Sequence, residues 1–317
     1  MSQLPRYESY KDSGMQWLGE IPSHWTVLRL DKGCEIVRGN TGFSKADLLE
    51  EGQYVALQYG RTYKVDEIND SFSSYVNEEF YKSGQIAGYG DIVLISTSET
   101  IEDLGHSCFY ARQNIGLIGG EQFLLKVNQE KASGKYFYYL TKAFSRYLRR
   151  YATGTKVYRF NSDNLKKIYI PQVPLDEQKI IADFLDKRLA QVDALIAKQE
   201  TLLEKLAEQR VALISHAVTK GLNPDVEMKA SGVEWLGKVP KSWDIANLRY
   251  FISCNSGDAL ESSRILRDAD EFNNIPVIGG NGFLGFTENS NYKKECIAVG
   301  RVGALCGNVH FIDYESC

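Results

Sequence analysis

Apolar side chains recur at alternating steps of four and three residues through the middle of the chain. This heptad spacing is typical of an α-helix that pairs with another helix along one seam. No Pro or Gly interrupts residues 175–220, so we expect one long helix there. The seam positions are Leu185, Leu189, Val192, Ile196, Gln199, Leu203, Leu206, Arg210, Leu213 and Ala217.

The sequence also predicts where this helix begins and ends. Pro174 precedes it, Asp176 is the expected N-cap, and Glu177 adds negative charge in the first turn. Gly221, followed by Pro224, stops it. At ~1.5 Å per residue the helix is roughly 60 Å long, more than one small core buries. It therefore needs a partner helix, from this chain or another, and we interpret it as a spacer coiled coil rather than a long core helix.

Two polar residues interrupt the apolar seam. They are Gln199 and Arg210. Polar residues at seam positions usually fix the register of a coiled coil at some cost in stability. The seven apolar side chains that we expect at the interface are Leu185, Leu189, Val192, Ile196, Leu203, Leu206 and Leu213.

The region before the helix shows the pattern of strands and loops. Short β-rich runs at residues 54–59, 91–95 and 122–127 are bounded by Gly or polar residues, with turns at 39–42 and 119–120. The polar or basic loops 38–45, 58–64 and 96–99 are candidates for ligand recognition, although each also fits an ordinary solvated loop. Their candidate binding residues are Arg38, Lys45, Gln58, Arg61, Ser96 and Thr97.

A strongly basic segment follows these strands. Residues 134–151 form an amphipathic helix in projection, with Leu140, Phe144, Tyr147, Leu148 and Tyr151 on one side. Residues 134–170 contain nine Lys or Arg and only one acidic residue, although the whole chain has a net charge of −4. Basic residues interleaved with aromatics favour contact with a phosphate backbone. A solvated face, or a docking face for an acidic protein, is the alternative. The candidates on the polar side are Lys142, Arg146, Arg149 and Arg150.

The loop at residues 152–160 joins Gly154, small hydroxyl residues and two bases at the end of that helix. Thr155 and Lys156 suit phosphate oxygens, and Arg159 suits guanine through a bidentate contact. Residues 164–171 then indicate a short turn and a closing strand.

The chain contains an internal repeat. Residues 11–30 match residues 229–248 at a constant offset, with nine of twenty positions identical, and all four Trp residues lie in it. Gly39 and Gly257 continue the register. The repeat predicts tandem related domains, in which Trp side chains anchor each repeat in a core and Gly allows the bend. A binding role for the Trp residues is the alternative.

The second copy is shorter than the first. Residues 274–286 and 297–311 both have the pattern strand, Gly turn, strand, and Arg301 in the latter is a candidate binding residue. No counterpart of the basic helix, the 152–160 loop or the heptad helix follows, so the chain looks cut short. The expected domains are residues 1–174, 175–220 and 228–317, in a mixed α+β fold with two α/β globules joined by the long helix.

Composition narrows the classes of function. No apolar run approaches ~20 residues, and the N-terminus has no signal-peptide core. The six Cys residues form no CxxC pair or Cys/His ligand spacing, which predicts reduced thiols in a cytoplasmic protein, with no metal. We find no phosphate-binding Gly loop and no nucleotide-cofactor motif, and therefore expect no cofactor.

The repeated SGxxWLGxxPxxW motif at residues 13–25 and 231–243, together with IYIPQVPLDEQKIIADFLD at residues 168–186, resembles the specificity subunit of type I restriction-modification systems. The resemblance covers nearly the whole chain. It implies target recognition domains that each read half of a split DNA site. It also implies an antiparallel coiled-coil spacer that docks methyltransferase subunits, through them restriction subunits, and no catalysis by the subunit alone.

Departures from that family pattern leave other readings open. The second recognition domain is incomplete and the second helical region is missing, so the partner of the long helix is, on one reading, a second copy of the chain, which would give a homodimer. Two other functional classes are a stand-alone DNA methyltransferase or nuclease, and a coiled-coil scaffold without a DNA role. A methyltransferase would need a cofactor loop and an Asn/Asp-Pro-Pro-aromatic site, and neither is present.

Overall fold

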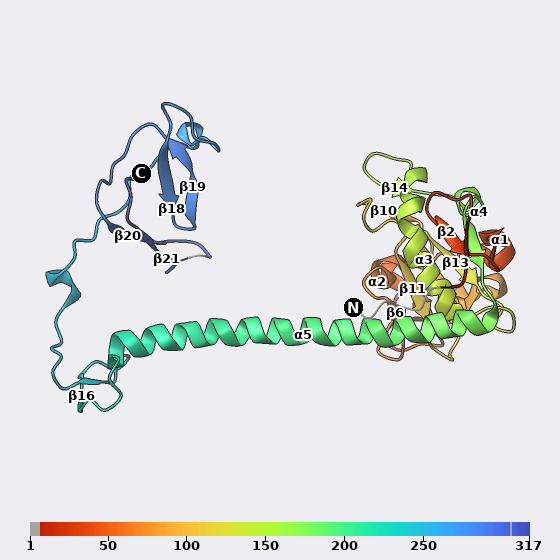
Figure 1. Cartoon of the computed structure of the whole chain (residues 1–317), viewed down its shortest axis with the longest axis horizontal. Helices are drawn as coiled ribbons and strands as arrows, with labels where there is room; N and C mark the ends of the chain where they lie inside the picture. Colours follow the sequence, from red (N-terminus) through yellow and green to blue (C-terminus); the bar gives the residue numbers. More distant parts are fainter. Residues whose placement is uncertain (1–6, 305) are drawn as a thin grey trace. The chain divides into compact units, whose positions relative to one another are not determined.

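The computed structural model describes residues 7–304 and 306–317, and the first six residues of the expected domain 1–174 lie outside this range. The chain forms two compact units, Met1–Arg210 and Val211–Cys317. The first unit combines two mixed sheets with helices, as Figure 1 shows. The predicted mixed α+β fold is therefore confirmed.

Two sheets form the centre of the first unit. The five-stranded sheet has the order β4-β13-β9-β11-β6, with β6 parallel to β11 and the other pairs antiparallel. The four-stranded sheet has the order β7-β5-β12-β8, with β5 parallel to β12. The strands are β4 (Glu35–Arg38), β5 (Tyr54–Leu57), β6 (Glu67–Ile68), β7 (Tyr75–Val76), β8 (Ile86–Ala87), β9 (Ile92–Ile95), β11 (Ser107–Tyr110), β12 (Gly116–Ile118) and β13 (Gln122–Lys126).

Three short ribbons and five α-helices complete this part of the chain. The predicted strand at 54–59 ends early, because Gln58 O accepts hydrogen bonds from Arg61 N and Thr62 N and starts a helical turn. The ribbons are β1 (Tyr10–Asp12) with β2 (Glu20–Pro22), β3 (Thr26–Arg29) with β15 (Tyr169–Gln172), and β10 (Thr97–Ser98) with β14 (Tyr158–Arg159). The helices are α1 (Leu30–Gly33), α2 (Tyr59–Thr62), α3 (Gly134–Leu148), α4 (Ser162–Lys166) and α5 (Leu175–Lys220). Short 3₁₀ helices lie at Lys45–Asp47, Glu78–Phe80, Ser83–Gln85 and Arg149–Tyr151.

Helix α3 covers the five-stranded sheet, and the predicted helix at 134–151 is confirmed. Its apolar side packs on β9 and β11, with Leu140, Phe144 and Leu148 buried in the main core. Ser133 caps the N-terminus through its hydroxyl, which accepts a hydrogen bond from Tyr136 N. The N-terminal half is buried more completely than the amphipathic pattern predicts, since Tyr136, Phe137 and Tyr138 are also buried.

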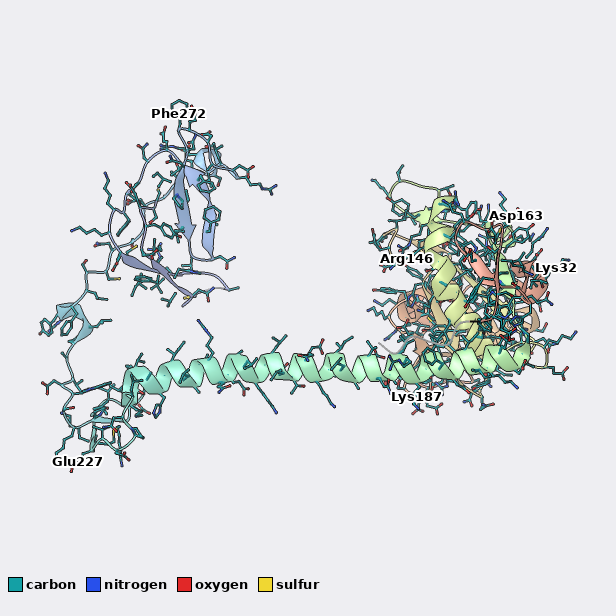
Figure 2. The ribbon with its side chains drawn as sticks, viewed as in Figure 1. Lys32, Arg146, Asp163, Lys187, Glu227 and Phe272 are labelled. Carbon is teal, nitrogen blue, oxygen red and sulfur yellow. The ribbon has the colours of Figure 1, made fainter. Side chains whose placement is uncertain are left out.

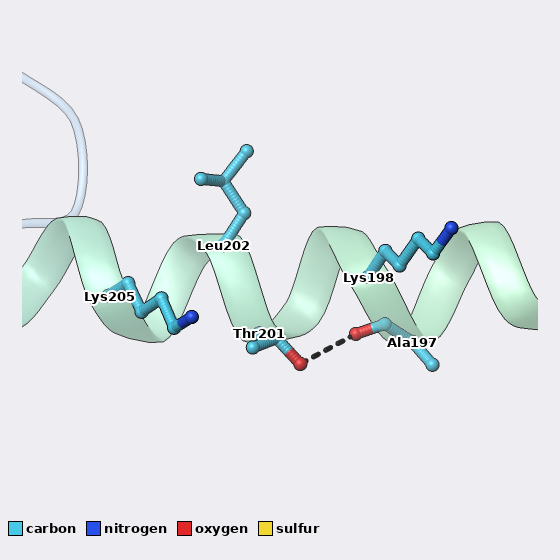
Figure 3. A pocket seen from close by; sticks show the side chains of 5 residues that line it. All are labelled: Ala197, Lys198, Thr201, Leu202 and Lys205. Carbon is cyan, nitrogen blue, oxygen red and sulfur yellow. Dashed lines mark hydrogen bonds between the residues drawn. The ribbon is translucent and has the colours of Figure 1, made fainter.

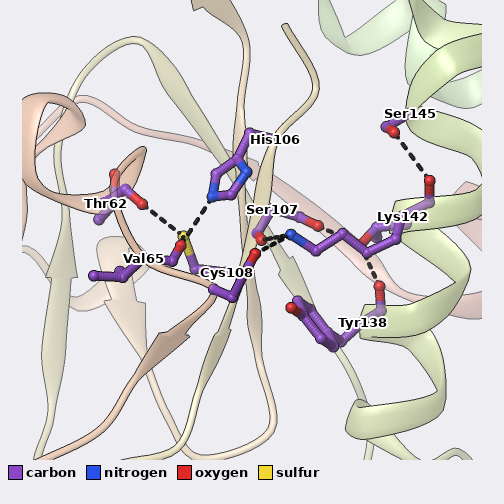
Figure 4. A network of polar contacts seen from close by, with 10 residues as sticks. Thr62, Val65, His106, Ser107, Cys108, Tyr138, Lys142 and Ser145 are labelled. Carbon is purple, nitrogen blue, oxygen red and sulfur yellow. Dashed lines mark hydrogen bonds and ion pairs between the residues drawn. The ribbon is translucent and has the colours of Figure 1, made fainter. Parts of the chain in front are cut away.

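A polar network ties α3 to β11 and to the segment that follows α2 (Figure 4). Lys142 Nζ donates to Ser107 O and forms an ion pair with Asp66, and Ser107 Oγ lies 2.7 Å from Thr141 Oγ1. His106 Nε2 lies 2.8 Å from Val65 O. Burial and the positive charge of Lys142 lower the pKa of His106, against smaller opposing contributions from Val65 O and neighbouring carboxylates.

We predict that the stability of the first unit falls as the pH drops below ~6.5, the ordinary His pKa. Because the folded-state pKa of His106 is lowered, the unfolded state binds the proton first, so this stability is fully present above that value and lost below it. His106→Gln should flatten the difference between pH 7.5 and pH 5.5 in urea unfolding followed by Trp fluorescence. His216→Gln, at an exposed position of α5, is the matched control, and equal curves for both variants would contradict the prediction.

The two copies of the repeat fold in the same way. The β1–β2 ribbon pairs Tyr10 with Pro22, and the ribbon of β16 (Met228–Ala230) and β17 (Lys238–Pro240) pairs Met228 with Pro240. Gly19 and its counterpart Gly237 have φ of 64° and 62°, which only Gly adopts easily. The predicted internal repeat and its Gly bend are thus confirmed.

The Trp side chains of the two copies differ in their surroundings. Trp17 donates to Tyr169 O and packs edge-on against Phe144, and Trp25 donates to Glu177 Oε2. Trp235, by contrast, is 81% exposed. The prediction that the Trp residues anchor the core is therefore wrong for the second copy, because the described residues after 248 supply no equivalent of α3 or β15.

The long helix α5 begins and ends close to the predicted bounds. It starts at Leu175, so Asp176 lies within the first turn and its prediction as N-cap is wrong. Pro174 O instead accepts the first hydrogen bond, from Gln178 N. The helix start is fixed to the first unit, because Gln178 and Ala182 are buried and Tyr139 donates to Asp186.

Beyond its first turns α5 has exposed side chains. Leu185 is half-buried, but Leu203 and Leu213 are each 67% exposed in the single chain. The remaining predicted interface residues, Leu189, Val192, Ile196 and Leu206, are 44–50% exposed. A hollow beside α5 is lined only by residues of this helix and is therefore no enclosed ligand cavity (Figure 3); they are Ala197, Lys198, Thr201, Leu202 and Lys205.

The second unit consists of short antiparallel ribbons. The predicted strand–turn–strand elements are confirmed as β18 (Ile275–Gly279) with β19 (Gly282–Thr287), and β20 (Cys296–Val299) with β21 (Val309–Ile312). Short 3₁₀ helices lie at Leu248–Tyr250 and Ser262–Arg264. Few side chains are buried, among them Val239, Val277 and Ile312.

Candidate nucleic-acid interface

Four segments that are distant in sequence meet at one end of the first unit. The short strand β10 pairs with β14, so that Thr97 lies opposite Arg159. Ser96 N donates to Glu121 O at 3.1 Å, and Phe160 N donates to Ser96 O at 3.1 Å. We call this surface, formed by residues 58–59, 97–99, 119–121 and 153–159, the loop edge.

Backbone packing holds the loop edge close to the loop at 38–45. Gly119 N donates to Leu57 O, and Gly39 N donates to Gln122 O, both at 3.0 Å. A Cβ added to Gly39 would lie 1.7 Å from Gly119 O, so only Gly permits this approach. Three of the loops that the sequence singled out are thereby held together with the 152–160 loop.

A shallow hollow of about 130 Å³ lies in the loop edge. It presents an aromatic ring, two hydroxyls and two carboxylates. Glu121 has a φ of 64°, the only positive value among the described residues other than Gly. Among the described residues, the carboxylates of Glu99 and Glu121 form no ion pair. The residues that line the hollow are Tyr59, Thr97, Ser98, Glu99, Glu121 and Val157.

Basic side chains lie next to this edge. Helix α3 runs from α5 toward the β10–β14 ribbon, and Arg146 is exposed on it (Figures 1 and 2). Arg150 is also exposed and its guanidinium stacks 4.5 Å from the centre of the Tyr147 ring. Lys156 and Arg159 are exposed on the loop that follows. Among the described residues, none of these four side chains forms an ion pair.

Two basic residues of α3 are engaged within the protein. Lys142 is half-buried and paired with Asp66, and Arg149 donates to Glu102 O. Burial opposes ionisation of Asp66, but its hydrogen bond and charge interaction with Lys142 lower its pKa overall. Both side chains therefore hold the 99–106 loop and β11 against α3, and they are less available to a ligand than Arg146 and Arg150.

The other predicted residues divide by exposure. Arg38, Lys45, Arg61 and Thr155 are exposed in the first unit, and Gln58 and Thr97 are half-buried at the loop edge. Ser96 is only 7% exposed, because it forms the backbone junction of the edge. Arg301 is exposed in the second unit, where its Nη1 donates to Ser256 Oγ at 3.2 Å.

Tyr59 and Glu99 lie in the candidate loops 58–64 and 96–99 but were not named as binding residues, and Glu121 lies outside every predicted recognition loop. The signal for Glu121 was its position directly after Gly119 and Gly120, within a turn that leads into a buried strand. Tyr59 belonged both to the predicted strand 54–59 and to the candidate loop 58–64, and the structure places it at the start of α2.

Within residues 7–304 and 306–317 there is no group of three or more His, Cys, Asp or Glu side chains placed to hold a metal ion. No helix in the described part of the chain has the length and apolarity needed to span a membrane.

The chain is similar in sequence to specificity subunits of type I restriction enzymes. The specificity subunit of the MjaVIII type I restriction enzyme of Methanocaldococcus jannaschii is 24% identical over 277 residues, which cover 87% of this chain and 60% of that protein. The putative MjaX specificity subunit of the same organism is 28% identical, over 78% of this chain and 57% of its own length. The chain thus spans about 60% of the length of these relatives.

A solved structure shares the fold. A chain from a study of complex assembly and conformational transition in the type I R-M system superposes with a TM-score of 0.52 and 18% identity. The match covers 66% of this chain and 49% of the other. Residues 22–205, more than half of the chain, match the family described as type I restriction modification DNA specificity domain. The chain therefore belongs to the type I restriction-modification DNA specificity family.

Proposed function

We propose that this chain recognises DNA as a specificity subunit and that the loop edge reads the bases. The observation that carries the proposal is the convergence of four distant segments at one end of the first unit, beside exposed Arg146 and Arg150 on α3. This surface has polar groups that can contact base edges, next to Arg side chains that form no ion pair and can contact phosphates. Specific DNA binding needs both kinds of contact. The chain itself carries out no chemistry in this proposal.

The two kinds of side chain have separate roles. Arg146, Arg150 and Lys156 contact phosphates, which positions the duplex but does not distinguish sequences. Thr97 and Arg159, at the edge of the hollow, face base edges in the major groove. Tyr59 supplies an apolar surface beside them.

The carboxylates of the hollow suggest which base is read. A carboxylate repels phosphates, so Glu99 and Glu121 weaken nonspecific contact and are useful only where they accept a hydrogen bond from a base. The exocyclic amino group of cytosine is the usual donor to Glu in the major groove. Glu121 lies directly before β13 and has a positive φ, a backbone conformation that residues other than Gly rarely adopt and that is often found at functional sites.

We predict that Glu121→Gln relaxes base preference at one position of the target, by about 10-fold to 100-fold, because a carboxylate contact to a base contributes ~1–3 kcal/mol of discrimination. Affinity for unrelated DNA should stay the same or rise slightly as one negative charge is removed. Competition binding with duplexes that differ at single positions measures both. Glu130→Gln, at an exposed position outside the edge, should retain the parental preference. If the base preference of Glu121→Gln equals that of the parental chain, Glu121 does not read a base.

Titration with duplex DNA at two salt concentrations tests the proposed function. Neutralisation of phosphates releases counterions, so we expect affinity to fall steeply between about 0.05 M and 0.2 M salt. The chain should be measured alone and with a type I methyltransferase subunit. Binding that is absent, or independent of salt, in both settings would contradict the proposal.

The exposed helix α5 is the proposed assembly surface. Its apolar side chains are too numerous for solvent exposure in a working protein, since large exposed apolar patches mark interaction sites. We propose that methyltransferase subunits bind to α5 and that restriction subunits join the complex through them. A second copy of this chain is the proposed partner for the heptad seam itself.

A further inference from the structure

Two neighbouring Arg residues at the end of α3 lie in different surroundings. Arg150 is exposed, and its guanidinium stacks 4.5 Å from the centre of the Tyr147 ring. Arg149 is half-buried and its Nη2 donates to Glu102 O, while its Nε is buried without a hydrogen-bond partner among the described residues. Arg150 is therefore available to a phosphate, whereas Arg149 is committed to the loop at residues 99–106.

The 99–106 loop joins the hollow of the loop edge to the main core. Glu99, at the start of the loop, lines the hollow, and Leu104, near its end, is fully buried in the core. Gly105 N donates to Ile95 O at 3.1 Å, which fixes the end of the loop to β9. Residues 100–103, between these points, are exposed or half-buried, so core packing alone does not hold Glu99 in place.

Hydrogen bonds of two kinds restrain this exposed part of the loop. Thr100 Oγ1 donates to Asp103 Oδ2 at 2.6 Å, and Thr100 N donates to Ser98 Oγ at 3.2 Å. These two bonds shape the loop but do not attach it to a helix. Arg149 supplies that attachment, because its guanidinium reaches the Glu102 carbonyl from the end of α3. A charged donor makes this the stronger kind of hydrogen bond.

We propose that Arg149 is a positioning residue for base recognition, which fixes the 99–106 loop so that the carboxylate of Glu99 meets a base edge. This role rests on the proposed function, in which Glu99 accepts a hydrogen bond from a base. A hydrogen bond weakens steeply when its distance or angle changes, so a shifted loop loses discrimination but keeps its charge. Arg149 itself contacts no phosphate and adds little to the affinity for unrelated DNA.

Competition binding with duplexes that differ at single positions tests this role in the full chain. Arg149→Met should relax base preference about tenfold at one position of the target, and Glu99→Gln should relax it at the same position. The double variant should be no more relaxed than Glu99→Gln alone, because both changes remove the same contact. Arg149→Lys, whose ammonium group can still donate to Glu102 O, should recover most of the preference.

Salt dependence separates positioning from phosphate contact. Arg150→Met, the matched control, should lower the slope of log affinity against log salt by about one and leave base preference unchanged. Arg149→Met should show the reverse pattern. Its hydrogen bond to Glu102 O is exposed, so the variant should remain folded in urea unfolding. Thr100→Val removes the bond to Asp103 and no charge, so it should relax the same position without changing the slope.

The possible outcomes distinguish this role from the proposed function. A lower salt slope with unchanged base preference in Arg149→Met would assign Arg149 to phosphate binding and overturn the proposal. Losses of preference that multiply in the double variant with Glu99→Gln would also overturn it. Salt-dependent DNA binding without any base preference in the parental chain would instead contradict base reading at the loop edge, and with it the proposed function.

Discussion

Replacing Arg146, Arg150, Lys156 and Arg159 together by Ala is expected to weaken binding to duplex DNA about 100-fold at ~0.1 M salt. Removal of each side chain that binds a phosphate should also reduce the slope of log affinity against log salt by about one. The four side chains are exposed and form no ion pair among the described residues, so their loss should not unfold the protein. Fluorescence titration at three salt concentrations measures both quantities.

The matched control removes the same charge from another surface. Lys179, Lys187, Lys198 and Lys205 are exposed on α5, and their joint replacement by Ala changes the net charge of the chain equally. A general effect of net charge would weaken DNA binding in both variants alike. A similar loss in the two variants would contradict a specific role for the surface beside the loop edge. Lys142 and Arg149 are left in place because they hold Asp66 and Glu102.

Gly39→Ala is expected to destabilise the first unit by about 3 kcal/mol. The added Cβ would lie 1.7 Å from Gly119 O, and the atom that must move is backbone, so no side chain can rotate away. Since this contact joins the 38–45 loop to the loop edge, DNA affinity should fall as well. Urea unfolding followed by Trp fluorescence measures the change in stability.

The repeat supplies a control for this prediction. Gly257 stands at the position that corresponds to Gly39, but no atom lies within 4 Å of an added Cβ there. Gly257→Ala should therefore change stability by less than about 0.5 kcal/mol. A small effect at Gly39, comparable with that at Gly257, would show that the loops are not held together as described.

Local patterns in the sequence predicted the elements that depend on neighbouring residues. The helix at 134–151, the long helix, and the ribbons of residues 275–287 and 296–312 all follow from periodicity and Gly turns. The identity of the two copies predicted related folds, and the structure shows a ribbon with the same strand register in each. These features need no information about distant contacts.

Features that depend on long-range contacts were not predictable. Lys142 and Asp66 lie 76 positions apart in the sequence, so nothing local showed that Lys142 is paired. The proximity of Thr97, Glu121 and Arg159 likewise results from strand pairing and turns between distant segments. Identical Trp residues have different exposure in the two copies because packing partners, and not the repeat itself, determine burial.

The position of methylated bases in DNA shows most directly whether this chain selects the DNA sequence that is modified. Random-sequence DNA is exposed to a type I methyltransferase subunit with the chain, without it, and with a Thr97→Ala/Glu121→Gln variant, and the modified bases are mapped. We predict that the parental chain directs modification to one defined sequence and that the variant relaxes the choice at specific positions. Methylation at the same sites with and without the chain would contradict a role of the chain in DNA recognition.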